Sequence, residues 1–212
     1  MKMLLKVIPV GPLEVNCSII ADPKTGEAII VDPGGDGERI IETAKEFRVK
    51  AVVNTHGHID HVGQVRKVKE FFNVPFYLHP EDIPLIRDEI WPGFASYIKA
   101  QECPEPDVFL EDGMEIKVGG ITLKVLHTPG HTPGLCCLYA EEEKVLIAGD
   151  LLFKGSVGRW DLPGGDREKL KRSLERVFSE LPDDTIVVCG HYEETTIGHE
   201  RRFNPYLHGG LL

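Results

Sequence analysis

Long apolar runs are absent from this sequence of 212 residues, and none approaches the roughly 20 apolar residues that a membrane-spanning helix needs. The first six residues are too few and too charged to act as a secretion signal. Basic residues are also scarce, with 24 Lys and Arg against 34 Asp and Glu and a formal charge of −10. Because nucleic acids need a basic surface, we expect a cytoplasmic protein with a small-molecule partner and no nucleic-acid or membrane contact.

Cysteine is sparse and gives no sign of a disulfide framework. The five cysteines form no Cys-x-x-Cys pair, and most lie within apolar stretches: Cys17, Cys103, Cys136, Cys137 and Cys189. We therefore expect buried, reduced thiols. The sequence also lacks a Gly-x-Ser-x-Gly motif, which argues against a serine nucleophile of the α/β-hydrolase kind.

Histidine, in contrast, is concentrated in one short run. Residues 56–61 read His-Gly-His-Ile-Asp-His, which places three imidazoles and a carboxylate within six positions. Neutral imidazole and carboxylate are the ligands that zinc and similar divalent metals prefer. The run begins where the apolar stretch Ala51–Asn54 ends, and open α/β sheets bind their ligands at the carboxyl ends of strands. The run therefore predicts a metal site.

Three further candidate ligands occur in the same kind of setting. His131, Asp150 and His191 each follow a glycine at or just after the end of a predicted strand. Together with the run, they give seven candidate ligands: His56, His58, Asp60, His61, His131, Asp150 and His191. One ion takes about four ligands, so this number suggests two ions that share a carboxylate.

This pattern resembles the metallo-β-lactamase superfamily, and within it the short form of the glyoxalase II-like hydrolases. The likeness rests on His-x-His-x-Asp-His with the later His, Asp and His, and on four further segments: Asn16–Ile20, Val31–Gly35, Thr128–Gly134 and Gly158–Gly165. The resemblance implies two metal ions, the first held by His56, His58 and His131. It implies that the second is held by Asp60, His61 and His191, with Asp150 bridging the two.

The resemblance implies an α/β fold, a four-layer αβ/βα sandwich that forms a single domain over residues 1–212. The apolar periodicity supports two similar halves, each with strands and helices. It predicts helices near 37–48, 62–72 and 166–180 and strands near 3–10, 15–21, 27–32, 51–54, 75–79, 114–118, 121–127, 134–140, 143–148 and 185–189.

Residues 80–107 break this pattern. They are rich in proline and carry Trp91, Phe94 and Tyr97 at helix-like spacing. We expect a helical insertion packed on the body of the protein. The alternative is a lid whose aromatic side chains line the substrate pocket.

The resemblance implies hydrolysis of a thioester, most naturally one of the hydroxyacylglutathione type. Two divalent ions, zinc first and iron or manganese as alternatives, would hold a bridging hydroxide that attacks the carbonyl. A second role is open for Asp60, to orient that hydroxide or take its proton. Arg159 is the candidate to bind a substrate carboxylate, the alternative being an ion pair with Asp161 or Asp166. Asp161 stands where the family favours an aromatic residue.

Two other functions stay open. The iron-dependent persulfide dioxygenases have a similar backbone and a comparable Gly-Arg-x-Asp segment, and they use one iron held by two histidines and one aspartate. The other alternative is a metal-binding protein of the same fold that catalyses no reaction.

Three polar residues outside the motif follow predicted strands. Asp32 is expected to cap its turn or to hydrogen-bond to a ligand histidine. His79 and His127 are expected to act as local hydrogen-bonding residues, because buried imidazoles need partners.

Overall fold

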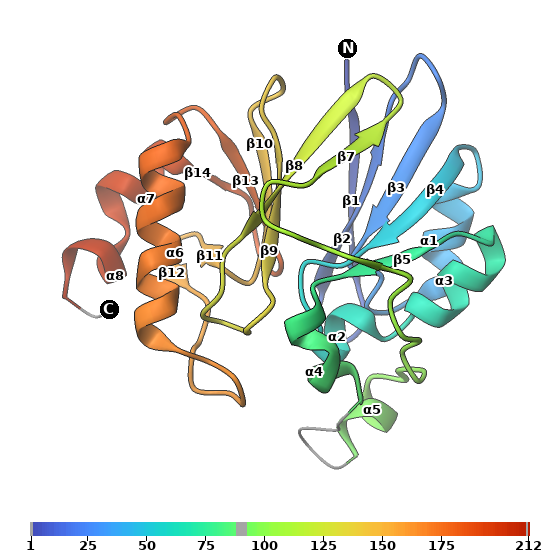
Figure 1. Cartoon of the computed structure of the whole chain (residues 1–212), viewed down its shortest axis with the longest axis horizontal. Helices are drawn as coiled ribbons and strands as arrows, with labels where there is room; N and C mark the ends of the chain where they lie inside the picture. The colour runs from blue at the N-terminus through green and yellow to red at the C-terminus, as the bar shows by residue number, and fades with distance from the viewer. Residues whose placement is uncertain (1, 88–92, 211) are drawn as a thin grey trace.

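The structure of the chain, a computed structural model, describes residues 2–87, 93–210 and 212. Two six-stranded sheets face each other at the centre, and helices cover the outer face of each (Figure 1). This arrangement confirms the predicted α/β fold, a four-layer αβ/βα sandwich.

The first sheet is built mainly from the first half of the chain. Its strands in spatial order are β1 (Leu4–Val10), β2 (Val15–Ala21), β3 (Glu27–Val31), β4 (Arg48–Val53), β5 (Phe76–Leu78) and β6 (Val108–Phe109). Neighbours are antiparallel from β1 to β3 and parallel from β3 to β6. Because β3, β4 and β5 are parallel, their carboxyl ends lie at one edge of the sheet.

The second sheet is built from the second half. Its strands in spatial order are β14 (Thr195–Thr196), β13 (Ile186–Cys189), β10 (Val145–Gly149), β9 (Cys136–Ala140), β8 (Ile121–His127) and β7 (Glu115–Val118). Only the β10–β13 pair is parallel among these neighbours, and β8 runs in the same direction because two antiparallel pairings separate it from β10. The strands β8, β10 and β13 therefore also end at one edge.

Alternating side chains divide the apolar residues among three cores. The core between the sheets includes Ile20 and Val53 from the first sheet and Ile147 from the second. The outer face of the first sheet packs on α1 (Gly37–Ala44) and α3 (Val65–Phe72). The outer face of the second packs on α6 (Arg167–Glu180) and α7 (Ile197–Phe203), and α8 (Pro205–His208) follows α7.

The helix α6 illustrates how the local sequence determines an element. The Asp166 side chain accepts a hydrogen bond from the Lys169 backbone N–H at 2.9 Å and so caps the first turn. Leu170, Leu174 and Val177 recur at helical spacing and are buried against the second sheet. This helix matches the one predicted near 166–180.

Some boundaries differ from the predicted ones. The helix predicted near 37–48 ends at Ala44, because Arg48 already pairs with the first sheet and donates its backbone N–H to Gly26 O at 2.8 Å. The helix predicted near 62–72 begins only at Val65 as α3, and a separate short helix, α2 (Ile59–Val62), precedes it. The short strands β6, β11 (Leu152–Phe153), β12 (Ser156–Val157) and β14 were not expected, since two residues show no periodicity.

The insertion at 80–107 contains only short helical segments in its described part. These are η1 (Pro80–Asp82), α4 (Ile83–Arg87) and α5 (Phe94–Tyr97). Ile98 is buried, and Gln101 donates its backbone N–H to Gly63 O at 2.8 Å, so this part contacts the body of the protein. Trp91 lies outside the described residues.

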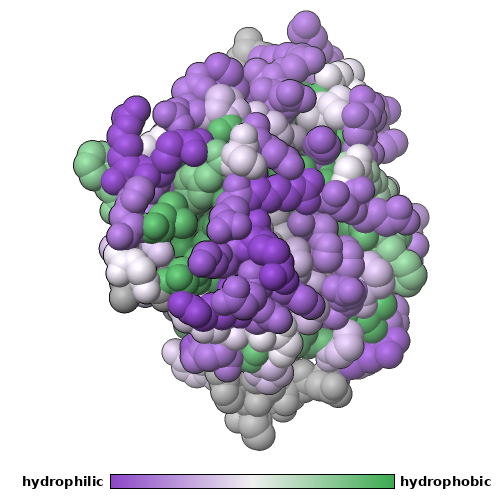
Figure 2. All heavy atoms as spheres, turned by 60° about the vertical axis from the view of Figure 1, so that its left-hand side comes forward, coloured by the Kyte–Doolittle hydropathy of each residue, from purple (hydrophilic) through white to green (hydrophobic). Residues whose placement is uncertain are grey.

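The surface agrees with the composition. Within the described ranges, no helix is long and apolar enough to cross a membrane. On the face shown in Figure 2, hydrophilic side chains cover most of the surface and apolar side chains gather in smaller patches. All five cysteines are free. Four of them are buried, as predicted, whereas Cys103 is only partly buried.

Candidate metal centre

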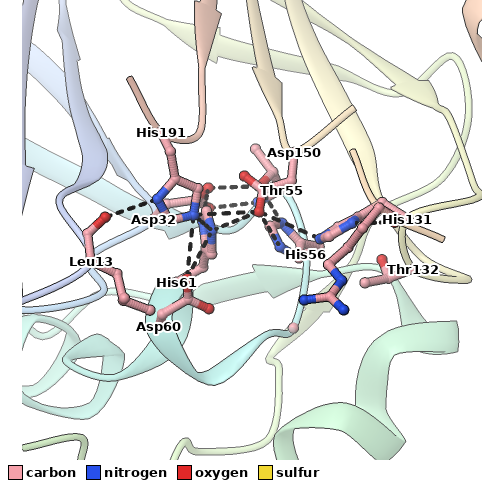
Figure 3. A network of polar contacts seen from close by, with 12 residues as sticks. Leu13, Asp32, Thr55, His56, Asp60, His61, His131, Thr132, Asp150 and His191 are labelled. Carbon is pink, nitrogen blue, oxygen red and sulfur yellow. Dashed lines mark hydrogen bonds and ion pairs between the residues drawn. The ribbon is translucent and has the colours of Figure 1, made fainter. Parts of the chain in front are cut away.

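All seven predicted ligands meet at the edge of the sandwich where strands of both sheets end. Figure 3 labels all of them except His58. Four come from the segment after β4 and three from the loops after β8, β10 and β13: His56, His58, Asp60, His61, His131, Asp150 and His191. The two sheets thus contribute to one cluster of histidines and aspartates that can bind metal.

The first trio consists of His56, His58 and His131. One ligand atom from each lies within 4.8 Å of the others, and all three residues are buried. The Nε2 atoms of all three are buried without a hydrogen-bond partner in the described part of the chain. Buried polar atoms normally have partners, so three such atoms facing one point fit a metal ion.

The second trio consists of Asp60, His61 and His191. Asp60 Oδ2 lies 3.3 Å from His191 Nε2 and 3.6 Å from His61 Nε2. The two imidazole nitrogens are 3.3 Å apart. These separations are those of ligand atoms that surround one cation.

Asp150 lies between the trios. Its Oδ2 is 3.4 Å from His131 Nε2 and 3.3 Å from His61 Nε2, so one oxygen contacts both trios. The same oxygen is 3.7 Å from His56 Nε2 and 3.4 Å from His191 Nε2. Asp150 Oδ1 is buried without a hydrogen-bond partner in the described part of the chain. This is the position that a bridging carboxylate requires.

Four of the imidazoles are oriented through their other ring nitrogen. His131 Nδ1 lies 2.8 Å from Arg159 O, and His191 Nδ1 lies 3.0 Å from Leu13 O. A carbonyl only accepts, so each Nδ1 carries a proton, and each Nε2 is the ring nitrogen left to face the centre.

Asp32 and Thr55 orient the other two imidazoles. Asp32 Oδ2 lies 3.0 Å from His61 Nδ1 and accepts a hydrogen bond from Thr55 Oγ1 at 2.6 Å. Because the Thr55 hydroxyl donates its hydrogen to Asp32, its oxygen is free to accept a hydrogen bond from His56 Nδ1 at 2.9 Å. The expected hydrogen bond between Asp32 and a ligand histidine, in which Asp32 accepts from His61, is therefore confirmed. Since the Asp32 oxygens already accept these bonds, Asp32 orients imidazoles and does not add a ligand.

The two trios differ in their electrostatics. Burial lowers the pKa of His58 to about 3 and also lowers the pKa of His56 strongly, so both imidazoles are neutral and suited to bind metal. At His191 burial acts in the same direction, but hydrogen bonds with Asp150 and Asp60 outweigh it and raise the pKa to about 9. The carboxylates therefore favour positive charge at the second trio, which a cation can supply.

Asp82, on η1, connects the two main ligand loops. Its buried carboxylate accepts from Gly57 N at 2.9 Å and from Thr132 Oγ1 and Gly134 N at 2.8 and 2.6 Å. Burial raises the pKa of this carboxyl, although the hydrogen bonds oppose that shift. The sequence offers one weak signal for it, the Pro80 that begins a helical turn, and nothing that indicates the link between loops.

His79 and His127 stack with their ring centroids 4.1 Å apart and their planes at 11°. His79 Nδ1 accepts from the Glu81 N–H at 3.2 Å, and His127 Nε2 donates to Pro133 O at 2.9 Å. Ligand-type atoms of His79, Glu81 and His127 also lie within 4.8 Å of one another, but a hydrogen bond already occupies one nitrogen of each imidazole. Their hydrogen bonds support the predicted local role for both.

An open pocket of about 430 Å³ lies over the cluster. Its lining includes five candidate metal ligands, His58, Asp60, His131, Asp150 and His191, and Arg159, the candidate to bind the substrate. The other lining side chains are mostly apolar: Leu13, Ile59, Leu85, Phe94, Phe153, Ser156, Val157, Leu162 and Tyr192. Leu85 and Phe94 belong to the insertion at 80–107, so that segment forms part of the pocket wall. Tyr97 is exposed and lies outside this lining.

The sequence matches proteins of one superfamily. A family model described as the metallo-beta-lactamase superfamily matches residues 10–191. An uncharacterized protein of Aquifex aeolicus (strain VF5) is 67% identical over 99% of both chains. The hydroxyacylglutathione hydrolase GloC of Haemophilus influenzae is 38% identical over 97% of this chain and 98% of that protein.

Solved structures give the same result. The chain resembles BLEG-1 B3 metallo-beta-lactamase (TM-score 0.86, 38% identity, 96% of this chain and 99% of that one). It resembles TTHA1623 in a di-iron-bound form (TM-score 0.85, 37% identity, 95% and 99%). It also resembles ETHE1 from Myxococcus xanthus (TM-score 0.80, 25% identity, 97% and 85%). With the sandwich fold and the His/Asp cluster, these matches establish that the chain belongs to the metallo-β-lactamase superfamily.

Proposed function

We propose that the chain is a metal-dependent hydrolase that cleaves thioesters, with hydroxyacylglutathione thioesters the first to test. The observation that carries this proposal is the position of Asp150, whose Oδ2 contacts both trios at the floor of the pocket. The partnerless Nε2 atoms of His56, His58 and His131 support an ion at the first trio.

We assign the metal ligands as two sets that share Asp150. One divalent ion is held by His56, His58 and His131, and another by Asp60, His61 and His191. Zinc is the first choice for these nitrogen and oxygen ligands, and iron is supported by the similar di-iron-bound structure, with manganese also suited. Bound ions of this kind supply Lewis acidity and water activated for attack.

Asp60, a member of the second trio, also lines the pocket. Burial opposes its charge, but His61 and the hydrogen bond with His191 outweigh burial and lower its pKa. Asp60 therefore stays ionised, which favours ligation of a cation and alignment of a water over storage of a proton.

The pocket lining supports a substrate whose leaving group needs little protonation. Apart from the candidate ligands, the described lining contains no carboxyl group and no further histidine to act as a general acid. A thiolate leaves without one, which favours a thioester, and the similar hydroxyacylglutathione hydrolase suggests the carrier. The free cysteines fit a reducing cytoplasm, where glutathione is present.

A persulfide dioxygenase is the second candidate. His56, His131 and Asp150 would form the two-histidine, one-aspartate set for a single iron, since Asp150 Oδ2 lies 3.7 and 3.4 Å from the two Nε2 atoms. The similarity to ETHE1 favours testing it. The complete second trio favours hydrolysis.

The test is hydrolysis of S-D-lactoylglutathione by protein whose metal content is measured by elemental analysis. We expect about two ions per chain and turnover that is lost in Asp150→Ala. Asp184→Asn is the control, because Asp184 is exposed, pairs with Lys144 and lies at the opposite end of β13.

Three outcomes would contradict the proposal in different ways. Full activity and two ions in Asp150→Ala would refute the bridging assignment. Two ions without hydrolysis would refute the glutathione thioester as substrate. One iron per chain, with oxygen uptake on glutathione persulfide, would favour the dioxygenase.

A further inference from the structure

Away from the candidate metal centre, the pocket wall carries very little positive charge. Among the described lining residues, Arg159 is the sole lysine or arginine, and the wall around it is mainly apolar, with Phe153, Val157 and Leu162. Lys154, adjacent to this wall, pairs with Glu193 at 3.1 Å. Away from the candidate metal centre, Arg159 is therefore the described lining side chain suited to bind a substrate carboxylate.

The Asp161 carboxylate occupies the two parallel N–H donors of the Arg159 guanidinium, which we call the fork. Arg159 Nε donates to Asp161 Oδ1 at 2.7 Å, and Nη2 donates to Asp161 Oδ2 at 2.9 Å. This two-point geometry is the one with which a guanidinium would bind a substrate carboxylate. The internal carboxylate and a substrate carboxylate therefore compete for the same donors.

The pair is held close to the proposed reaction centre. Arg159 O lies 2.8 Å from Nδ1 of His131, a candidate ligand of the first ion. The backbone that carries the guanidinium is thus tied to the cluster, while the side chains of Arg159 and Asp161 are 55% and 63% exposed. A substrate bound at the centre can reach the pair, and the exposed pair can open.

From this competition we infer that Asp161 is a specificity-determining residue, one that weakens binding of thioesters with a carboxylated thiol and favours those with an uncharged thiol. The inference rests on the proposed thioesterase function. Asp161 is attached two residues from Arg159, so its effective concentration at the fork is high, and an incoming carboxylate must displace it. An uncharged thiol carrier does not have to displace Asp161, and it would contact a mainly apolar pocket wall.

The experiment compares two thioesters that share a lactoyl group. One carries glutathione, which has free carboxylates, and the other carries N-acetylcysteamine, which is uncharged. We expect Asp161→Asn to lower the ratio of KM for the glutathione ester to KM for the cysteamine ester by about two- to fivefold, the scale of an exposed ion pair. The decrease should be smaller at high salt.

Two variants make this result specific. Asp184→Asn removes an equal charge from an exposed ion pair outside the described pocket lining and should leave the ratio unchanged. Arg159→Gln combined with Asp161→Asn should abolish the decrease, because the fork is then absent. Hydrolysis of both esters with an unchanged ratio in Asp161→Asn would overturn the inference and leave the thioesterase intact.

A binding measurement separates the inference from the proposed function. Calorimetric titration with S-methylglutathione, a thioether that cannot be hydrolysed, should give an affinity about two- to fivefold higher in Asp161→Asn. If neither thioester is hydrolysed, the proposed function fails, and this titration still decides the inference. Equal affinity in both proteins, or none in either, would overturn it.

Discussion

Asp150 is enclosed by backbone on two sides. A Cβ at Gly190 would lie 1.9 Å from Asp150 Oδ1, and a Cβ at Gly158 would lie 1.7 Å from Asp150 O. No rearrangement of a flexible side chain relieves the second contact, because it is with backbone. The loops after β12 and β13 approach Asp150 this closely because both positions are glycine.

We predict that Gly190→Ala disrupts the centre while the fold is retained. The methyl group would displace the Asp150 carboxylate, so metal content should fall and kcat/KM should drop about 10–100-fold, the effect of disturbing a ligand's surroundings. Elemental analysis and thioester kinetics measure both. Gly120→Ala is the matched control, since its Cβ would lie 3.6 Å from Asp22 Oδ2, an ordinary contact. Native metal content in Gly190→Ala would show that Asp150 tolerates displacement.

At the scale of elements, the site depends on segments that join loops far apart in the sequence. The carboxylate of Asp82 on η1 bonds to the loop after β4 through Gly57 and to the loop after β8 through Gly134. Glu200 on α7 accepts from Gly155 N at 2.7 Å and so anchors the β11–β12 hairpin, which supplies Phe153 to the pocket wall. The short elements η1 and α7 therefore hold the ligand loops and the β11–β12 hairpin of the pocket wall in place.

We expect Asp82→Ala to lower the free energy of unfolding by about 2–4 kcal/mol, because it leaves buried donors of both loops without an acceptor. Metal content should fall as well, since both main ligand loops lose their link. Denaturant unfolding and elemental analysis measure the two effects. Asp107→Ala is the control, because Asp107 accepts from Phe76 N but is 45% exposed, and it should cost about 1 kcal/mol. Equal losses in the two variants would rule out the linking role of Asp82.

Helices and strands were predicted correctly from the sequence where the apolar periodicity extends over several residues. The strands near 121–127 and 185–189 and the helix near 166–180 match β8, β13 and α6 closely, because alternation or helical spacing extends over several buried residues. The helix near 37–48 was predicted too long, because its last residues also fit a strand that begins at Arg48. Pairing with β3, a tertiary contact, decides between the two.

At the scale of the whole molecule, the candidate centre joins the two sheets. The chain before residue 62 supplies four candidate ligands and the second sheet's loops supply three, so an ion would connect both halves. Buried nitrogens of His56, His58 and His131 face one another there. Metal binding and stability should therefore be coupled.

We predict that removal of metal by a chelator lowers the Tm by about 5–10 °C. An ion present well above its Kd stabilises the folded state that binds it, and this stabilisation is lost when the ion is withdrawn. Thermal unfolding followed by circular dichroism measures the change. Added zinc should restore the Tm, and Asp150→Ala should show a much smaller response to the chelator. A Tm that does not respond to either treatment would mean that the ions contribute nothing to stability.

The sequence by itself determined the fold class, the superfamily and the candidate ligands, because the ligand types lie in the short segments that follow strands with a clear apolar pattern. Only the tertiary structure decided which groups orient those ligands. Leu13 O bonds to His191 and Arg159 O bonds to His131, and these partners are 178 and 28 residues apart in the chain. Local sequence carries periodicity and ligand chemistry, whereas a hydrogen bond between distant segments depends on how two packed sheets bring their edges together.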